Sequence, residues 1–328
     1  MATIVDVARL AGVTPTTVSR VINNRGYISE KTKSKVHEAM DQLSYQPNEI
    51  ARSLTKQRSN TIGVIVPHIS HPYFSKLISN LENEAAKKDY KIILCNSKDT
   101  ATKEKKYLDM CKSNRVDGII LCSGNVEYNM INTGNIPIVL LEKNFEKGKL
   151  GIQCDNYQGG CLATEHLIKC GCKRIVHFSG VIDEEMPADN REKAFIDVCS
   201  KNEIEYFIKK YDIDTYNQMN YYDYIKAALN EIEGVDGIFA SSDLIAAQVI
   251  QVCNEIKIRI PEDIKLVGFD DVDISQLTTP RITTVHQPIK EMARLSIELI
   301  NAKYNNIEVN EKTILSIKLI IRESTVNK

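Results

Sequence analysis

The stretch TIVDVARLAGVTPTTVSRVINN, from Thr3 to Asn24, is typical of two short helices joined by a tight turn. Apolar residues recur at helical spacing between Ile4 and Ala11, which gives the first helix one apolar face. Gly12 permits the positive φ at which a helix ends, and Thr14 followed by Pro15 suits the start of the second helix. The stretch therefore predicts a helix-turn-helix, whose second helix is free to enter a major groove.

The second helix has apolar residues on one side and polar residues on the other. An unrelated helical hairpin would share this spacing, but the outward Thr16 and Arg20 favour a helix that reads DNA. A third helix is predicted by the apolar spacing between Val36 and Leu43, which completes a three-helix core. The first 60 residues hold nine Lys and Arg against five Asp and Glu, and this positive excess suits phosphate contact.

Two runs of sequence carry a resemblance to a known family. They are DVARLAGVTPTTVSRVIN (6–23) and YQPNEIARSL (45–54), and the likeness continues through the remaining chain. The chain resembles the LacI/GalR family of bacterial repressors, and the run GYISEKT (26–32) is most similar to its sucrose and fructoside branch. The resemblance implies a DNA-binding headpiece over 1–58 with a hinge helix at about 48–55, and an effector-binding and dimerisation domain over 59–328.

The resemblance also implies which residues contact DNA. Base reading falls on Pro15, Thr16 and Arg20, and Leu54 falls on the apolar wedge that enters the minor groove at the centre of a palindromic operator. The alternative for Leu54 is a packing role in an ordinary linker helix. The full set of expected DNA-binding residues is Thr3, Thr14, Pro15, Thr16, Thr17, Ser19, Arg20, Asn23, Tyr45, Asn48, Ala51, Arg52 and Leu54.

From Thr61 the chain alternates between apolar strands and helices, twice over. Runs such as TIGVIVP (61–67) are typical of parallel strands covered on both faces, and VDGII (116–120) recurs as VDGIF (235–239). The expected fold class is a small all-α helix-turn-helix headpiece plus an α/β core of two Rossmann-like lobes, like that of periplasmic binding proteins. The first lobe is expected at about 60–156 and 289–318, and the second at about 157–288 and 319–328.

In such sheets ligands bind beyond the carboxyl ends of the strands, so the polar and aromatic residues that follow each strand are the candidate ligand groups. The expected effector-binding residues are His71, Tyr73, Phe74, Asn125, Glu142, Asn190, Arg191, Ser242 and Asp270. Further residues at strand ends are His68, Ser123, Lys143, Asn144, Asp243 and Asp271. The resemblance places Arg191, Asp270 and Ser242 at positions that hold the effector.

This mixture of carboxylates, amides, a guanidinium and aromatic rings suits a polyhydroxylated ligand, so the expected effector is a sugar or sugar phosphate. Relatives that bind sugars often place Trp or Phe where this chain has Ile213. Stacking on a sugar ring would then fall to Tyr73, Phe74 or Tyr216.

The function expected from these observations is a transcriptional regulator, and a repressor, that binds a palindromic operator as a homodimer under the control of a small effector. One alternative is a regulator whose main co-effector is a phosphorylated carrier protein, which the run SGNV (123–126) and the aliphatic Ile213 leave open. The other is a solute-binding receptor. The headpiece and the lack of an export leader disfavour the receptor.

Composition and motifs also bear on whether the chain is a membrane protein, a metal-binding protein or an enzyme. No apolar run approaches 18 residues, so we expect a cytoplasmic protein with no membrane contact. The nine Cys form no CxxC pair, which favours reduced thiols and no metal site. No nucleophile elbow, P-loop or dinucleotide motif is present, so we expect neither an enzyme nor a cofactor.

Overall fold

The computed structural model of the chain describes residues 2–46, 58–98, 100–123, 134–145, 149–181 and 186–326. The chain divides into two compact units, Met1–Ser59 and Asn60–Lys328, and each is described by itself. The expected hinge helix at about 48–55, with Asn48, Ala51, Arg52 and Leu54, lies outside the described residues.

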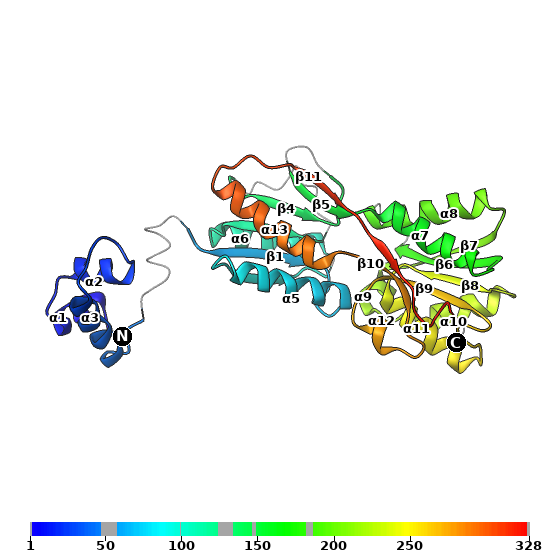
Figure 1. The fold of residues 1–328 in the computed structure, drawn as a ribbon, viewed down its shortest axis with the longest axis horizontal. Coiled ribbons are helices and arrows are strands. Elements are labelled where there is room, and N and C mark those ends of the chain that lie inside the picture. Colours follow the sequence, from blue (N-terminus) through cyan, green and yellow to red (C-terminus); the bar gives the residue numbers. More distant parts are fainter. Residues whose placement is uncertain are drawn as a thin grey trace. The chain divides into compact units, whose positions relative to one another are not determined.

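The first unit contains the helices α1 (Ile4–Ala11), α2 (Pro15–Ile22) and α3 (Glu30–Gln42) (Figure 1). Fully buried Val7, Val18 and Val36, one from each helix, form the centre of its core. The turn between α1 and α2 passes through Gly12 at a φ of 66°, which a residue with a side chain rarely adopts.

The second unit contains two six-stranded sheets, each covered by helices on both faces (Figure 1). The first sheet has the order β11-β5-β4-β3-β1-β2, and all its strands are parallel. Its strands are β1 (Thr61–Val66), β2 (Lys91–Asn96), β3 (Gly118–Leu121), β4 (Ile138–Leu141), β5 (Leu150–Cys154) and β11 (Lys312–Leu315). Its helices are α5 (Pro72–Ala86) and α13 (Ile289–Tyr304) on one face and α6 (Ala101–Ser113) on the other.

The second sheet has the order β12-β10-β9-β8-β6-β7 and is parallel except for β12, which runs antiparallel to β10. Its strands are β6 (Arg174–Val181), β7 (Glu205–Tyr211), β8 (Gly237–Ala240), β9 (Lys265–Asp270), β10 (Thr283–His286) and β12 (Lys318–Ile320). The helices α7 (Asn156–Lys169) and α8 (Asn190–Lys201) cover one face, and α10 (Tyr222–Glu231) and α11 (Asp243–Glu255) cover the other. This lobe also contains the short helices η2 (Pro187–Asp189), α9 (Ile213–Gln218) and α12 (Ile274–Leu277).

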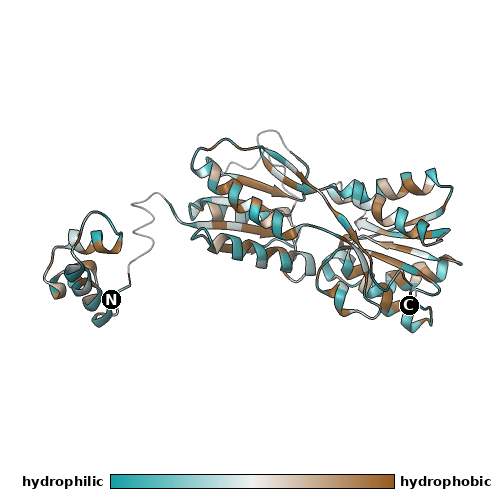
Figure 2. Cartoon of the chain, in the orientation of Figure 1, coloured by the Kyte–Doolittle hydropathy of each residue, from teal (hydrophilic) through white to brown (hydrophobic). Residues whose placement is uncertain are grey.

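The apolar residues gather on the strands of both sheets (Figure 2). In β1, Val64 packs in the cluster that contains residues of α5 and α13, whereas its neighbour Ile65 packs in the cluster that contains residues of α6. This alternation explains why the strand sequences read as continuous apolar runs, since both faces are covered.

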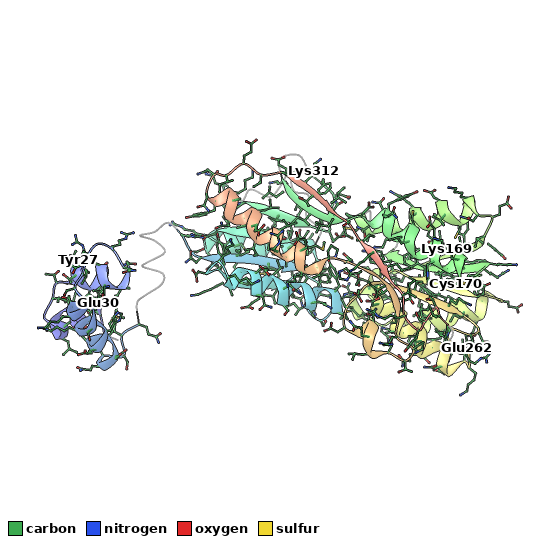
Figure 3. The ribbon with its side chains drawn as sticks, in the orientation of Figure 1. Tyr27, Glu30, Lys169, Cys170, Glu262 and Lys312 are labelled. Carbon is green, nitrogen blue, oxygen red and sulfur yellow. The ribbon has the colours of Figure 1, made fainter. Side chains whose placement is uncertain are left out.

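The chain crosses between the two lobes three times: after β5, after β10, and between β11 and β12. Lys318 therefore pairs in the second sheet, one residue position inside the range that the sequence predicts for the first lobe. Figure 3 shows Lys312 of β11 on one lobe and Lys169, at the end of α7, on the other. The repeated VDGI segments precede or begin β3 and β8, which occupy the same position in their sheets. The expected fold class is confirmed.

Candidate functional site

The headpiece presents the second helix of its helix-turn-helix with a polar outer face. Thr14 caps α2 by accepting a hydrogen bond from the Thr17 backbone N–H at 3.2 Å, and its hydroxyl lies 2.9 Å from that of Thr17. Pro15, Thr16 and Arg20, the expected base-reading residues, are all exposed. The start of α2 is therefore fixed by Thr14, while Pro15, Thr16 and Arg20 are exposed, as reading of base edges requires.

Other expected DNA-binding residues of the headpiece are partly used within it. The side chains of Thr3 and Asp6 form a capping box at the start of α1, and Asn23 donates to the Ser19 carbonyl oxygen at 2.8 Å. Tyr45 packs against the headpiece core. Tyr27, which was not expected to contact DNA, is 98% exposed (Figure 3).

The second unit contains a cavity of about 190 Å³ that residues of both lobes line. The first lobe contributes Pro67, His71, Tyr73, Phe74, Cys122 and Glu142. The second lobe and the second crossing contribute His177, Ser179, Gly180, Val181, Met186, Ala188, Asp189, Arg191, Tyr211, Tyr216, Tyr221, Ser241, Ser242, Asp270 and Gln287. Most of these residues lie at or just beyond the carboxyl ends of strands, where open α/β sheets bind ligands.

The cavity brings together most of the expected effector-binding residues. His71, Tyr73, Phe74, Glu142, Arg191, Ser242 and Asp270 line it. Asn190, the first residue of α8, does not line it, although both of its neighbours, Asp189 and Arg191, do. Asn125 lies outside the described residues.

Arg191 is the only Lys or Arg among the described residues that line the cavity. Its Nε donates to Asn156 Oδ1 at 2.7 Å, and one terminal nitrogen donates to the Ser241 carbonyl oxygen at 2.8 Å. Its guanidinium carbon lies 3.5 Å from the centre of the Phe269 ring, a close cation–π contact. These contacts fix the charge at the cavity wall.

Three carboxyl groups, those of Glu142, Asp189 and Asp270, line the cavity together with this single cation. Burial raises the pKa values of Asp189 and Glu142, and Asn156 and Arg191 oppose the rise for Glu142. Burial also raises the pKa of Asp270 to about 7, although Arg191 opposes this rise as well. Gln287 donates to Asp270 at 2.7 Å, and Asp270 is held at a φ of 112°, where residues other than Gly are strained. Such strain at a cavity wall is typical of a functional position.

Two histidines of the cavity are neutral and have opposite tautomers. Burial lowers the pKa values of both His71 and His177 to about 4. His71 Nδ1 accepts from the Tyr73 backbone N–H at 3.3 Å, so its proton is on Nε2. His177 Nδ1 lies 2.9 Å from the Phe239 carbonyl oxygen and therefore donates, which leaves its Nε2 as an acceptor.

The second lobe supplies an aromatic wall to the cavity, although this chain has Ile213 where sugar-binding relatives often have Trp or Phe. Ile213 begins α9 and does not line the cavity, whereas Tyr211, Tyr216 and Tyr221 do. The rings of Tyr211 and Tyr221 are in edge contact, with centres 4.8 Å apart. Only Tyr216 had been considered from the sequence. The position of Tyr211 at the carboxyl end of β7 could have indicated it.

Several other residues at strand ends serve the fold instead. Asp243 is fully buried and accepts from the Val272 N–H and the Thr284 hydroxyl. Asp271 accepts from Arg322 at 2.5 Å and from His286 at 2.8 Å. His68, Ser123, Lys143 and Asn144 do not line the cavity either. Asp243 and Asp271 therefore stabilise the fold, and the structure does not place any of these residues in the cavity wall.

Neither a metal site nor a membrane span is found where the structure is described. In those parts of the chain, no three His, Cys, Asp or Glu side chains are grouped so that they could hold a metal ion. No helix there combines the length and the apolar character needed to cross a bilayer.

Each of the two units matches the model of a known protein family. Residues 3–48 match the model of bacterial regulatory proteins of the lacI family, and residues 164–325 match a periplasmic binding protein-like domain. The sucrose operon repressor of Streptococcus mutans is 37% identical over 99% of this chain and 99% of its own length. The ribose operon repressor of Halalkalibacterium halodurans is 35% identical over 99% of this chain and 97% of its own length.

Solved structures give the same result. A periplasmic binding protein/LacI transcriptional regulator from Alkaliphilus metalliredigens, complexed with D-xylulofuranose, is 34% identical, with a TM-score of 0.75 over 82% of this chain and all of its own. The lac repressor dimer bound to operator has the same fold, with a TM-score of 0.88 at 24% identity over 99% of both chains. The curated relatives are transcriptional repressors rather than enzymes. With its helix-turn-helix and its two-lobed core, this chain is a DNA-binding transcriptional regulator that belongs to the LacI family.

Proposed function

We propose that the chain is a repressor that binds a palindromic operator as a homodimer and whose operator affinity changes when a neutral sugar occupies the cavity. One headpiece offers too small a surface for useful specificity, and two-fold symmetry doubles it. The exposed Thr16 and Arg20 of α2 are the proposed base-reading residues, and Leu54 is the proposed minor-groove wedge.

The observation that carries the sugar assignment is the composition of the cavity wall. Aromatic faces from both lobes can stack on a sugar ring, while Glu142, Asp270 and Gln287 can accept hydrogen bonds from its hydroxyls. His71, with its proton on Nε2, adds a neutral donor. The relatives named for sucrose and ribose operons, and the D-xylulofuranose bound to a similar structure, support the same ligand class.

The charges of the wall favour a neutral sugar over a sugar phosphate. Three carboxyl groups and one guanidinium line the cavity, and its two histidines are uncharged. A phosphate dianion would face net repulsion from Glu142 and Asp189, and Arg191 is already bonded to Asn156 and Ser241. The alternative co-effector, a phosphorylated carrier protein, stays a prediction from the sequence, and residues 124–126 of the run that suggested it lie outside the described residues.

The test is a thermal-shift titration of the full chain with sucrose, D-fructose and D-ribose, and with D-fructose 6-phosphate and D-ribose 5-phosphate. A sugar at about 100 times its dissociation constant adds about 2.7 kcal/mol of stability, enough to raise the unfolding midpoint by several degrees. The same sugar should change the affinity of the protein for its operator, selected from random DNA, in a gel-shift assay. A response to the phosphates alone would contradict the proposal.

A further inference from the structure

Asn156, the first residue of α7, joins a cavity residue of one lobe to a cavity residue of the other. Its own side chain is 3% exposed and does not line the cavity. Its Nδ2 donates to Glu142 Oε2 at 3.0 Å, and its Oδ1 accepts from Arg191 Nε at 2.7 Å. Glu142 follows β4 of the first sheet and Arg191 lies in α8 on the second, so one amide spans the boundary between the lobes.

The chemistry of this bridge suits an amide. A carboxylate can only accept hydrogen bonds and a guanidinium can only donate them, so a group between them must do both. The Asn156 Nδ2 also donates to the Cys154 carbonyl oxygen at 3.2 Å, which fixes the orientation of the amide. The amide therefore gives Glu142 a donor and Arg191 an acceptor, and it holds both charged groups at set positions on the cavity wall.

The bridge lies at the first crossing between the lobes, where a small movement of one lobe changes its geometry. Glu142 also accepts from the Cys154 thiol, with the sulfur 3.7 Å from Oε2, and the same sulfur lies 3.4 Å from Gln287 Oε1. Gln287 in turn donates to Asp270 at 2.7 Å. One chain of polar contacts thus runs from Arg191 to Asp270 through two of the three crossings, with the single Cys154 thiol proton between Glu142 and Gln287.

We propose that Asn156 is a positioning residue of the ligand cavity, which holds Glu142 and Arg191 at the separation that a bound sugar needs and makes the position of each depend on the other lobe. The choice of sugar as probe rests on the proposed function, whereas the contacts do not.

The first test measures sugar affinity by calorimetry on the full-length protein, with sucrose, D-fructose and D-ribose as probes. Asn156→Ala should weaken binding on the order of tenfold, because it removes hydrogen bonds to two charged groups. Asn80→Ala is the matched control, since the Asn80 amide donates within its own helix, to the Lys76 carbonyl oxygen of α5. Equal affinities, within twofold, for Asn156→Ala and the unaltered protein would overturn the proposal.

The second test is a double-mutant cycle that a merely structural role would not reproduce. Asn156→Asp places a second carboxylate beside Glu142, so its loss of affinity should be larger at pH 8 than at pH 5. In the background of Glu142→Gln, the amide introduced at position 142 can donate to the carboxylate at position 156. Asn156→Asp should then cost much less. An equal cost in both backgrounds would overturn the proposal.

A third measurement needs neither a variant nor a sugar. In the unaltered protein, NMR should show that the Arg191 Nε–H exchanges with solvent far more slowly than the same group of the exposed Arg20. Similar exchange rates would overturn the bridge. If none of the three sugars binds while this exchange is slow, the proposed sugar ligand is wrong and the bridge stands.

Discussion

The close approach of α7 and α8 at Gly160 is the feature that we expect to be least tolerant of a single methyl group. A Cβ at this position would lie 2.5 Å from the Arg191 carbonyl oxygen and 2.7 Å from Ala194 Cβ. Ordinary contact begins at about 3.4 Å, so Gly160→Ala must separate the two helices by about 1 Å. Because the nearest atom belongs to the backbone, a change of rotamer cannot relieve the clash.

The size of the effect follows from two opposing contributions. Overpacking of this kind costs about 3 kcal/mol at the upper end of its usual range, and the better helix propensity of Ala offsets about 1 kcal/mol. The net loss of about 2 kcal/mol should lower the unfolding midpoint by about 4–8 °C. Since the displaced backbone is that of Arg191, sugar affinity should fall as well.

Differential scanning calorimetry and a sugar titration measure the two effects. Gln158→Ala, at an exposed position of the same helix, is the control and should leave both unchanged. A midpoint for Gly160→Ala that is equal to or above that of the unaltered protein would show that helix propensity prevails and that the contact is not tight.

Three further predictions concern the two functions and the pH. Arg191→Ala should abolish the sugar response in a gel-shift assay and leave operator affinity unchanged; a normal response would remove Arg191 from the site. Leu54→Ala should lower operator affinity on the order of tenfold without changing sugar binding, and an unchanged gel shift would refute the wedge. Burial raises the pKa of Asp270 from 3.8 to about 7, so the folded protein keeps a proton that the unfolded chain releases, and the free energy of unfolding falls as pH rises from about 4 to 7. Asp270→Asn should reduce this fall, as measured by unfolding midpoints at pH 5 and pH 7.5, and an unchanged fall would assign it to other groups.

Local chemistry made the helix-turn-helix predictable from the sequence. Gly12, Thr14 and Pro15 act within one turn of the chain, and their effect does not depend on distant residues. The central strands β1, β3 and β4 were also predictable, because their residues form continuous apolar runs that contrast with the charged helices.

The residues of the cavity were predictable only where one rule applies, namely that ligands bind beyond the carboxyl ends of the strands. Asp243 and Asp270 both lie at strand ends, yet Asp243 bonds to a loop while Asp270 lines the cavity. Periodicity cannot distinguish them, because the direction of a side chain at a strand end depends on the backbone conformation there. Gln287 and Asn156 escaped prediction for a related reason: both lie at crossings between lobes, and their partners are more than ten residues away in the sequence.

The return of the chain from the second lobe to the first has a consequence for synthesis on the ribosome. The core of the first lobe includes Ile289, Met292 and Ile297 of α13, and its sheet ends with β11. A nascent chain that has emerged only to residue 288 has all the strands of the second sheet except β12, but its first sheet has one face without α13. The second lobe can therefore fold before the first is complete. The apolar face of the first sheet is the surface that a chaperone would need to protect during translation.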